Sequence, residues 1–390
     1  MAARIEGGSL DRVRLSTATT LDEIATLKPD YEHLGRVTAN RLPFALHEWH
    51  LTWCERVMNC DPRVREEPLF HVLRDSRGVC VAILPFIASI RRLGPLRVGS
   101  VAFIGPDPAL TEIRTPLIAP GFEHLAAQSA RESLAKRGDW DWIHWTGLPP
   151  ALANALRSEG EMRWQPSLAD FVLDLPATWE EFHRGLKRNI RESLRHGYNS
   201  LRRDRLSFSL KVLQSGSEVA EGIERFLLLH RMRAELPGRI RHVDHFASQV
   251  SRAFLRALCQ RLAATGVLRL FALTIDGEVA AMRIGFIVGD SLYLYYSGFD
   301  PRWWRYGVMT TTVAEAIKYA IAHQLKCVNL SPGWDIPKAR WSPRQIDYPA
   351  AFELRGRLRS RMMNGAYLKA RAEAGSGRFL HRLVGGRRWV

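Results

Sequence analysis

The sequence predicts a mixed α/β fold in which helices pack on mainly antiparallel sheets. Two observations lead to this prediction. A β-hairpin, a further strand, a helix and an apolar strand follow one another in the same order twice, about 190 residues apart. The chain has 390 residues, 46% of them hydrophobic, which is ordinary for a globular protein and long enough for two domains that each bury a core.

The first occurrence of this order begins with a hairpin in PLFHVLRDSRGVCVAILPFIAS, which turns at Asp75–Gly78. A helix is predicted over Glu123–Lys136, and an apolar strand over Asp141–Thr146. The loop before this helix carries prolines and acidic residues but a single arginine, Arg114. We therefore expect the first half to lack a cofactor and to help shape an acceptor groove.

The halves join near Leu175-Pro176, where Thr178 precedes a predicted helix and Glu181 follows three residues later. This spacing is typical of a helix N-cap. The predicted domains are residues 1–175, residues 176–354 and a basic C-terminal helix and tail over residues 355–390.

The second occurrence begins with a hairpin in VLRLFALTIDGEVAAMRIGFIV, whose turn is Asp276-Gly277. A strand is predicted over Leu292–Tyr296, an apolar-periodic helix over Val308–His323, and a buried strand over Cys327–Leu330. Upstream, a helix is predicted over Ile223–Ala234.

A basic loop leads directly into the second of these helices. The first amides of a helix have no internal partners, and the helix dipole places partial positive charge there. A diphosphate bound at this point would accept those amide hydrogens and pair with nearby arginines, which is a way to hold coenzyme A without a metal. The predicted cofactor-binding residues are Arg302, Arg305, Tyr306, Gly307, Val308, Met309 and Thr310.

Several motifs in the second half resemble one known superfamily. They are the strand end YYSGFDP, the Tyr306-Gly307 loop, and the pattern G-x-D-x-x-K-x-x-W formed by Gly333, Asp335, Lys338 and Trp341. The segments FLLLHRMR, LRLFALTIDGEVAA and FVLDLPATWEEFHRGLKRNIRESLR agree with it. Together they resemble the GNAT superfamily, in its CelD branch of exopolysaccharide acetyltransferases, which is related to the FemAB peptidyltransferases.

This resemblance implies two tandem GNAT-like domains, a degenerate one followed by one that binds acetyl-CoA as acyl donor. It also implies that the thioester lies between two splayed strands, here Tyr293–Ser297 and Val328–Ser331. One departure concerns Met309, which stands where GNAT loops usually have a small residue. A bound diphosphate would then lie slightly differently, or the cofactor pocket has weakened.

Three residues are candidates for the chemistry of acyl transfer. Tyr296 is placed to donate to a carbonyl or to protonate a leaving thiolate, although its alternation with the neighbouring tyrosines also fits sheet packing. His230 is a candidate base because histidine titrates near working pH, but a lone histidine on an apolar helix face is more often structural. Asp335 is a candidate base or acceptor-holding residue, and the alternative is a cap of the following turn.

Three further residues are candidates for binding the acceptor. Arg231 lies on the same predicted helix as His230, while Lys338 and Trp341 share one face at a spacing of three. Lysine would hold an anionic group and tryptophan would stack on a sugar; the simpler alternative is a local cation–π pair.

The net charge of +16 reflects an excess of arginine, with 48 Arg against 8 Lys. Residues 184–211 carry nine basic side chains and two acidic ones, and residues 355–390 carry ten and one. Such patches attract polyanions, but neither contains a recognisable nucleic-acid-reading motif. The apolar and basic residues of 375–390 suggest peripheral contact with an anionic membrane; the alternative is a packed helix followed by a basic end.

Other classes of protein find no support. No apolar run approaches the length of a membrane helix, and the N-terminus lacks the pattern of a signal peptide. The five cysteines are scattered, which argues against a zinc site or a disulfide framework and for a reducing cytoplasm. GxSxG, HExxH, P-loop and GxGxxG motifs are absent, and no metal is expected.

The sequence therefore favours an acetyl-CoA-dependent N- or O-acyltransferase that acts on a sugar, a polysaccharide precursor or an amine. Two alternatives stay open. One is a FemAB-like aminoacyltransferase, for which the basic segment 184–211 would bind tRNA. The other is a catalytically inactive scaffold of a polysaccharide synthesis complex.

Overall fold

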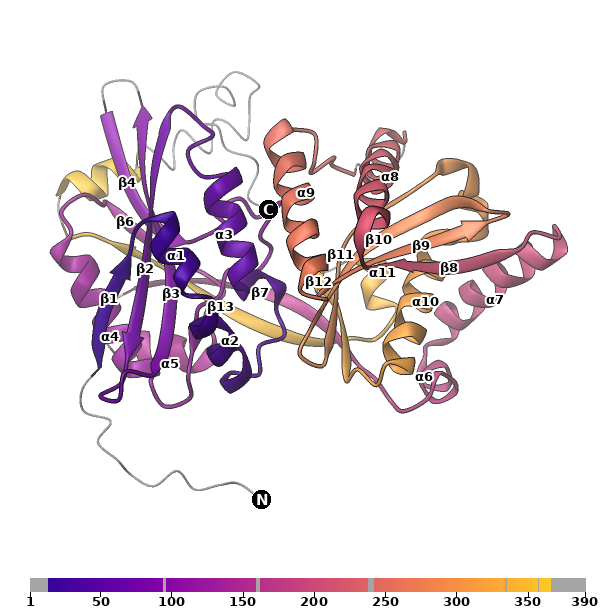
Figure 1. Cartoon of the computed structure of the whole chain (residues 1–390), viewed down its shortest axis with the longest axis horizontal. Helices are drawn as coiled ribbons and strands as arrows, with labels where there is room; N and C mark the ends of the chain where they lie inside the picture. Colours follow the sequence, from indigo (N-terminus) through magenta and orange to yellow (C-terminus); the bar gives the residue numbers. More distant parts are fainter. Residues whose placement is uncertain are drawn as a thin grey trace. The chain divides into compact units, whose positions relative to one another are not determined.

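A computed structural model describes residues 13–93, 96–158, 162–237, 242–333, 335–356 and 358–365 (Figure 1). The chain divides into two units. Unit 1 comprises residues 1–40, 44–167 and 348–390, and unit 2 comprises residues 41–43 and 168–347.

Unit 1 contains a sheet with the strand order β1-β2-β3-β4-β6-β13, and β5 pairs with β3. Its strands are β1 (Arg14–Ala18), β2 (Val64–Arg74), β3 (Cys80–Leu93), β4 (Leu96–Phe103), β5 (Leu117–Ile118), β6 (Trp142–Trp145) and the end of β13 (Arg344–Leu354). The labelled helices of this part of the chain are α1 (Leu21–Thr26), α2 (Lys28–Val37), η1 (Pro43–Ala45), α3 (His47–Arg56), α4 (Glu123–Lys136) and α5 (Pro150–Ser158), and residues 358–365 are also helical.

Unit 2 contains a sheet with the strand order β7-β12-β11-β10-β9-β8. Its strands are the end of β7 (Arg163–Asp174), then β8 (Phe208–Leu213), β9 (Leu268–Ile275), β10 (Glu278–Val288), β11 (Ser291–Phe299) and β12 (Cys327–Pro332). Its helices are α6 (Trp179–Gly185), α7 (Arg188–Arg203), α8 (Gly216–Glu235), α9 (Gln249–Ala264), η2 (Pro301–Tyr306), α10 (Val308–Ala322) and α11 (Ile336–Ala339).

The two units repeat one topology. In unit 1 the hairpin β2-β3 is followed by β4, α4 and β6, and β4 pairs with β6 in parallel. In unit 2 the hairpin β9-β10 is followed by β11, α10 and β12, and β11 pairs with β12 in parallel. The other described strand pairs are antiparallel, so the predicted mixed α/β class with mainly antiparallel sheets is confirmed.

The strand that follows each repeat in the chain ends in the sheet of the other unit. β7 follows β6 in the chain, yet its residues 170–174 pair with β12 in unit 2. β13 follows β12, yet its residues 351–354 pair with β6 in unit 1. Each sheet is therefore completed by a strand from the other repeat.

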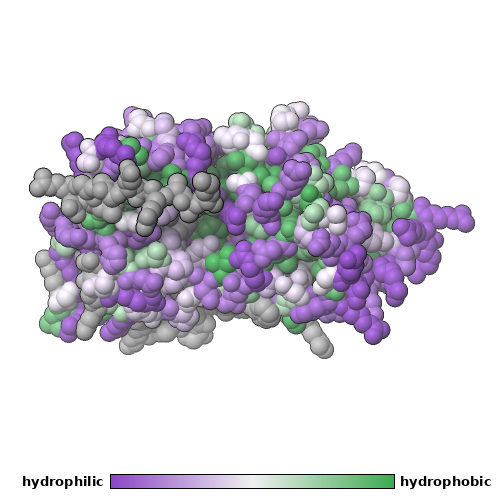
Figure 2. Space-filling view, turned by 90° about the horizontal axis from the view of Figure 1, so that it is seen from below, coloured by the Kyte–Doolittle hydropathy of each residue, from purple (hydrophilic) through white to green (hydrophobic). Residues whose placement is uncertain are grey.

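Helix α7 is strongly amphipathic. Ile190, Leu194 and Leu201 are buried, whereas five arginines on this helix are exposed, namely Arg188, Arg191, Arg195, Arg202 and Arg203. Gly197 lies on the buried side, where an added Cβ would come within 2.9 Å of the Tyr306 carbonyl oxygen, so α7 approaches the start of α10 closely. Figure 2 shows hydrophilic residues dominating the end of the molecule where Figure 1 places α7.

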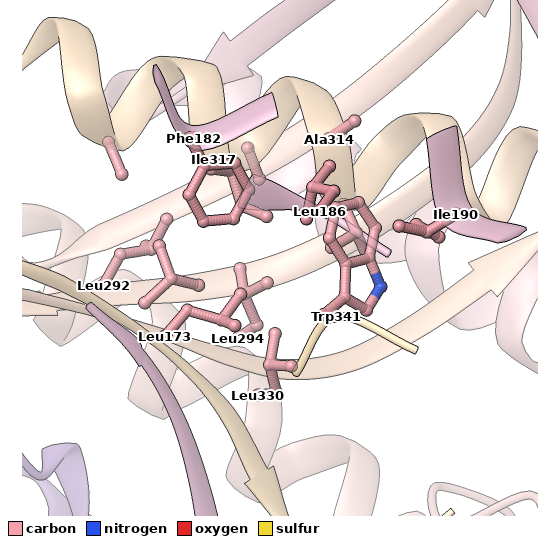
Figure 3. Close-up of a cluster of buried hydrophobic side chains, with 14 of the residues drawn as sticks. Leu173, Phe182, Leu186, Ile190, Leu292, Leu294, Ala314, Ile317, Leu330 and Trp341 are labelled. Carbon is pink, nitrogen blue, oxygen red and sulfur yellow. The ribbon is translucent and has the colours of Figure 1, made fainter. Parts of the chain in front are cut away.

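The core of unit 2 lies between its sheet and the helices α6, α7 and α10. Leu173, Leu292, Leu294 and Leu330 of the sheet pack there against helical residues and Trp341 (Figure 3). The helix α8 covers the opposite face of this sheet. Phe271 of β9 faces the core, so the adjacent Leu270 points to the other face, where it lies close to Gly222 of α8.

Most elements expected from local sequence patterns are confirmed. The hairpin turns at Asp75–Gly78 and Asp276-Gly277 connect β2 to β3 and β9 to β10. The Thr178 side chain accepts the Glu181 amide at the start of α6, as the spacing predicts. The segment after Phe299 differs from the expected loop, because the Asp300 side chain caps a 3-10 helix, η2, whose last residue is Tyr306.

Membrane contact was predicted for residues 375–390, and these lie outside the described residues. Among the helices that the structure describes, none has both the length and the apolar character needed to span a bilayer.

Gly298 on β11 marks a close approach of α8 to the sheet. A Cβ at this position would lie 2.3 Å from the His230 amide nitrogen and 2.5 Å from the Leu229 carbonyl carbon. These are backbone atoms that cannot turn aside, so we expect Gly298→Ala to lower the free energy of unfolding by about 1–3 kcal/mol. Denaturant unfolding measures the change. Gly185→Ala is the control, since its Cβ would meet nothing within 4 Å; equal effects from both variants would contradict this packing.

Candidate functional site

Strands β11 and β12 separate after a short parallel stretch. They pair at Ser291↔Cys327, Leu292↔Val328 and Tyr293↔Asn329. Beyond these pairs β11 continues to Phe299 and β12 to Pro332. We call this region the strand divergence. The main-chain groups along its two edges have lost their sheet partners and must find others.

Both diverging strands carry a β-bulge. In β11, Leu294 and Ser297 pair with Gly285 and Arg283, so two residues oppose one across β10. In β12, the register against β7 shifts between Asn329 and Pro332. Within this second bulge Ser331 adopts a φ of 70°, in the left-handed region.

Side chains from α8 hold the β11 edge of the divergence. The Ser297 carbonyl oxygen accepts from His230 Nδ1 at 2.9 Å and from Arg233 Nη1 at 3.4 Å. The Ser297 hydroxyl oxygen is 3.0 Å from Arg233 Nη1 and 3.3 Å from Arg283 Nη2. The serine therefore gathers two guanidinium groups at this edge.

Side chains near β12 hold its edge in the same way. The Ser331 amide donates to Asn329 Oδ1 at 2.7 Å. Lys338 Nζ donates to three successive carbonyl oxygens, those of Ser331, Pro332 and Gly333, at 3.3, 2.7 and 3.1 Å. Lys338, predicted to hold an anionic acceptor group, here fixes the loop after β12.

His230 is buried, and both of its ring nitrogens are engaged. Nε2 accepts the amide hydrogen of His245 at 3.3 Å, so Nδ1 carries the proton that is donated to Ser297. Burial lowers the pKa of His230, which favours this neutral form. The geometry thus matches the structural alternative for His230, and its role as a base stays a prediction.

The half-buried Tyr296 lies beside this histidine. Its ring stacks on His245 with centroids 4.7 Å apart and meets His230 edge-on at 5.6 Å. The structure therefore brings together His230 and Tyr296, two of the three candidates for chemistry.

Asp335, the third candidate, caps the short helix α11 by accepting the Lys338 amide at 2.7 Å. It is exposed, and it acts electrostatically on the β11 edge. Burial lowers the pKa of the Arg233 guanidinium, and the Asp335 carboxylate offsets part of that effect. The capping alternative for Asp335 is observed, and a chemical role stays a prediction.

Two residues predicted to bind the acceptor are engaged in other contacts. Trp341 is 6% exposed and packs in the core among Leu186, Ile190 and Ala314 (Figure 3), so its ring is covered and has no open face for a sugar. Arg231 is exposed on α8 and lies 3.9 Å from Glu235 in an ion pair on the same helix.

The predicted cofactor loop has the expected helix start. Gly307 has a φ of 64°, ends η2 and caps α10, and a Cβ there would meet nothing within 4 Å. The amides of Val308, Met309 and Thr310 occupy the first turn, where a helix offers no acceptors. Met309 is half-buried against a core cluster containing Phe299, so its bulk is partly accommodated inside the protein.

The two arginines of this loop already have acidic partners. Arg302 pairs with Asp300 and with Glu278, each at 2.8 Å. Arg305 pairs with Asp204 at 3.3 Å and lies over the ring of Tyr306, whose hydroxyl also bonds Asp204. Both arginine side chains are about two-thirds exposed, at 65% and 71%, so a diphosphate would reach them by exchange with these carboxylates. The residues therefore fit coenzyme A through the helix amides first and the arginines second.

One functional candidate had no role assigned from the sequence. Asp170 on β7 is 0% exposed; its Oδ2 accepts from Asn329 Nδ2 at 2.6 Å, and its Oδ1 has no hydrogen-bond partner among the described residues. Burial raises the pKa of Asp170 to about 6. The available signal was an acidic residue inside the apolar strand segment Ala169–Leu173. Among the described residues, no group of three or more His, Cys, Asp or Glu side chains could hold a metal.

Comparison with known proteins agrees with this architecture. Residues 188–341 match the family described as an acetyltransferase (GNAT) domain. The FemX crystal structure covers 84% of this chain and 96% of its own at a TM-score of 0.58 and 10% identity. The crystal structure of a conserved protein of unknown function from Bacteroides thetaiotaomicron VPI-5482 covers 88% of this chain and 100% of its own, at a TM-score of 0.50 and 11% identity. No curated protein matches the sequence.

The domain match supports a GNAT-type transferase and covers most of unit 2. The two structural alignments show that the fold is shared along nearly the whole of both other chains.

The raised pKa of Asp170 predicts a pH-dependent stability. The carboxyl titrates near 6 in the folded protein and near 3.9 when unfolded, so its protonated form favours folding. That contribution is fully present below about pH 4 and is lost as the pH rises through 6. Between pH 4 and pH 6 this titration should lower the free energy of unfolding of the wild type by roughly 3 kcal/mol, and we expect Asp170→Asn not to show this loss.

Denaturant unfolding at pH 4, 5, 6 and 7 measures this effect. The control is Asp174→Asn on the same strand, whose side chain is 67% exposed and pairs with Arg344. Parallel stability curves for wild type and Asp170→Asn would show that Asp170 titrates normally.

Proposed function

We propose that the protein is an acyl-CoA-dependent acyltransferase, with acetyl-CoA as donor and a sugar, a polysaccharide precursor or an amine as acceptor. The observation that supports it most strongly is the order β11, η2, α10 and β12, in which diverging strands are joined through an open helix N-terminus. The match of residues 188–341 to the GNAT acetyltransferase domain adds to this support. The free state of the five cysteines agrees with a cytoplasmic location.

In this proposal the donor lies along the strand divergence with its diphosphate at α10. The amides of Val308–Thr310 hold the diphosphate, and Arg302 and Arg305 neutralise it. The thioester then lies near the bulge of β11, where Tyr296 projects beside His230. Asp335 and Lys338 lie at the β12 side and organise the loop that borders the acceptor.

Unit 1 is proposed to lack a cofactor of its own. The residue before its corresponding helix, α4, is Phe122, and the Glu123 carboxylate accepts the Gly121 amide at 2.9 Å. An acidic group therefore lies where unit 2 has a basic loop, which disfavours a diphosphate.

An aminoacyl-tRNA-dependent transferase is the second candidate, and one observation favours it. The exposed arginines of α7 form a basic helix face close to the start of α10. Such a face attracts a polyanion larger than coenzyme A. Equilibrium binding of acetyl-CoA and of tRNA to the full chain separates the two candidates, and binding of neither favours a scaffold.

The cofactor loop provides a direct test by isothermal titration with acetyl-CoA. A charge-assisted contact contributes about 1.5–3 kcal/mol, so Arg305→Ala should weaken binding by roughly tenfold or more. Arg305 is the cleaner position, because Asp204 keeps Arg203 as a partner, whereas removing Arg302 leaves the buried Asp300 without its arginine.

Arg256→Ala is the matched control, since it removes an arginine that pairs with Glu224 on the surface of α8 and α9. It should leave the affinity unchanged. Wild-type affinity in Arg305→Ala and in a correctly folded Arg302→Lys would sink the assignment of this loop.

A further inference from the structure

Asp170 presents the one carboxylate oxygen among the described residues that is buried without a hydrogen-bond partner. Leaving a charged oxygen desolvated and unpaired is costly, and native proteins do so rarely. An apolar residue at this position of β7 would avoid the cost. A use for the free oxygen would explain why the sequence keeps it.

Asp170 lies at the level where β11 and β12 have already separated. Its register partner is Pro332, three residues beyond the last β12 residue that still pairs with β11. Its strand neighbour Phe171 points into the core facing α10, so Asp170 projects from the other face of the sheet. The helix α8 covers this face, and its His230 and Arg233 bond the opposite edge of the divergence.

The carboxylate is fixed in orientation. Asn329 Nδ2 donates to Oδ2, while Asn329 Oδ1 accepts the Ser331 amide, so the amide group of Asn329 links Asp170 to the bulge of β12. The cationic side chains of Lys338 and Arg344 lower the pKa of Asp170, but they offset only part of the increase that burial causes. The result is a held carboxylate that binds and releases a proton within the physiological range.

We propose that Asp170 is the base that takes the proton of the acceptor, and that the acceptor is a primary amine. This rests on the proposed acyl-CoA-dependent transfer. The amine nitrogen attacks the thioester carbonyl carbon, the N–C bond forms and the C–S bond breaks. The nitrogen passes one proton to Asp170 Oδ1, which returns it to water, and the coenzyme A thiolate takes up a proton from solvent.

The amine class follows from the strength of the base. A nitrogen that has added to a carbonyl is strongly acidic, so a carboxylate suffices to take its proton. A sugar hydroxyl must lose its proton during attack and needs a stronger base.

The test compares thiol release from acetyl-CoA with matched acceptors. Glucosamine is paired with glucose, and putrescine with 1,4-butanediol. The wild type should act on an amine and leave its hydroxyl counterpart unchanged. Asp170→Asn should lower kcat roughly 100-fold or more, keep the KM for acetyl-CoA, and lose the acidic limb of the kcat–pH profile.

Asp174→Asn, on the same strand and the same face, should behave as the wild type. If Asp170→Asn unfolds at a lower temperature than the wild type, Asp170→Glu is tested in its place. This variant should keep the acidic limb of the kcat–pH profile and have a lower kcat. A wild-type kcat in Asp170→Glu would overturn the assignment. Wild-type kcat with an unchanged limb in Asp170→Asn overturns the role of Asp170 alone. Transfer to a hydroxyl acceptor overturns the amine class. A wild type that transfers to no acceptor overturns the proposed function and this inference with it.

Discussion

The geometry of unit 2 depends on how the main-chain hydrogen bonds lost between β11 and β12 are replaced. Parallel strands that separate leave amides and carbonyls facing each other without partners, and buried backbone groups must be satisfied. The β11 edge obtains its partners from α8, through His230 and Arg233. The β12 edge obtains them from Asn329 and Lys338. The polar side chains near the divergence therefore already form structural hydrogen bonds, and any substrate that binds these side chains must share those bonds or replace them.

The two ends of the proposed donor site differ in electrostatic character. At the start of α10 the arginines are exposed and paired with carboxylates, so they can change partners at little cost. At the divergence Arg233 is half-buried and Asp170 is buried, and burial lowers the pKa of Arg233 and raises that of Asp170. Changes at the first end should act on affinity, and changes at the second on proton transfer and on folding.

Local sequence chemistry predicted the elements well where the cause was local. The Asp276-Gly277 turn and the Thr178 cap each follow from residues adjacent in the chain, and both are observed. The strand divergence could be named only through a family resemblance, because it arises from the register between strands that are far apart in sequence. For the same reason the sequence did not indicate a role for Asp170, because that role depends on Asn329 lying beside it in the sheet. Lys338 and Trp341 were predicted to bind the acceptor, but their surroundings depend on the loop after β12 and on α6, α7 and α10.

The exchange of strands between the two units has a consequence for the order in which the protein is made. Unit 2 is an almost continuous stretch of chain, so it can assemble as soon as residues up to 347 have left the ribosome. Unit 1 waits longer, because Trp145 of β6 pairs with Ala351 of β13, which is synthesised last among its strands. Until then the edge of β6 is an open strand, able to pair with another nascent chain. The order of synthesis therefore favours sequential assembly, in which the first half of the chain is completed last.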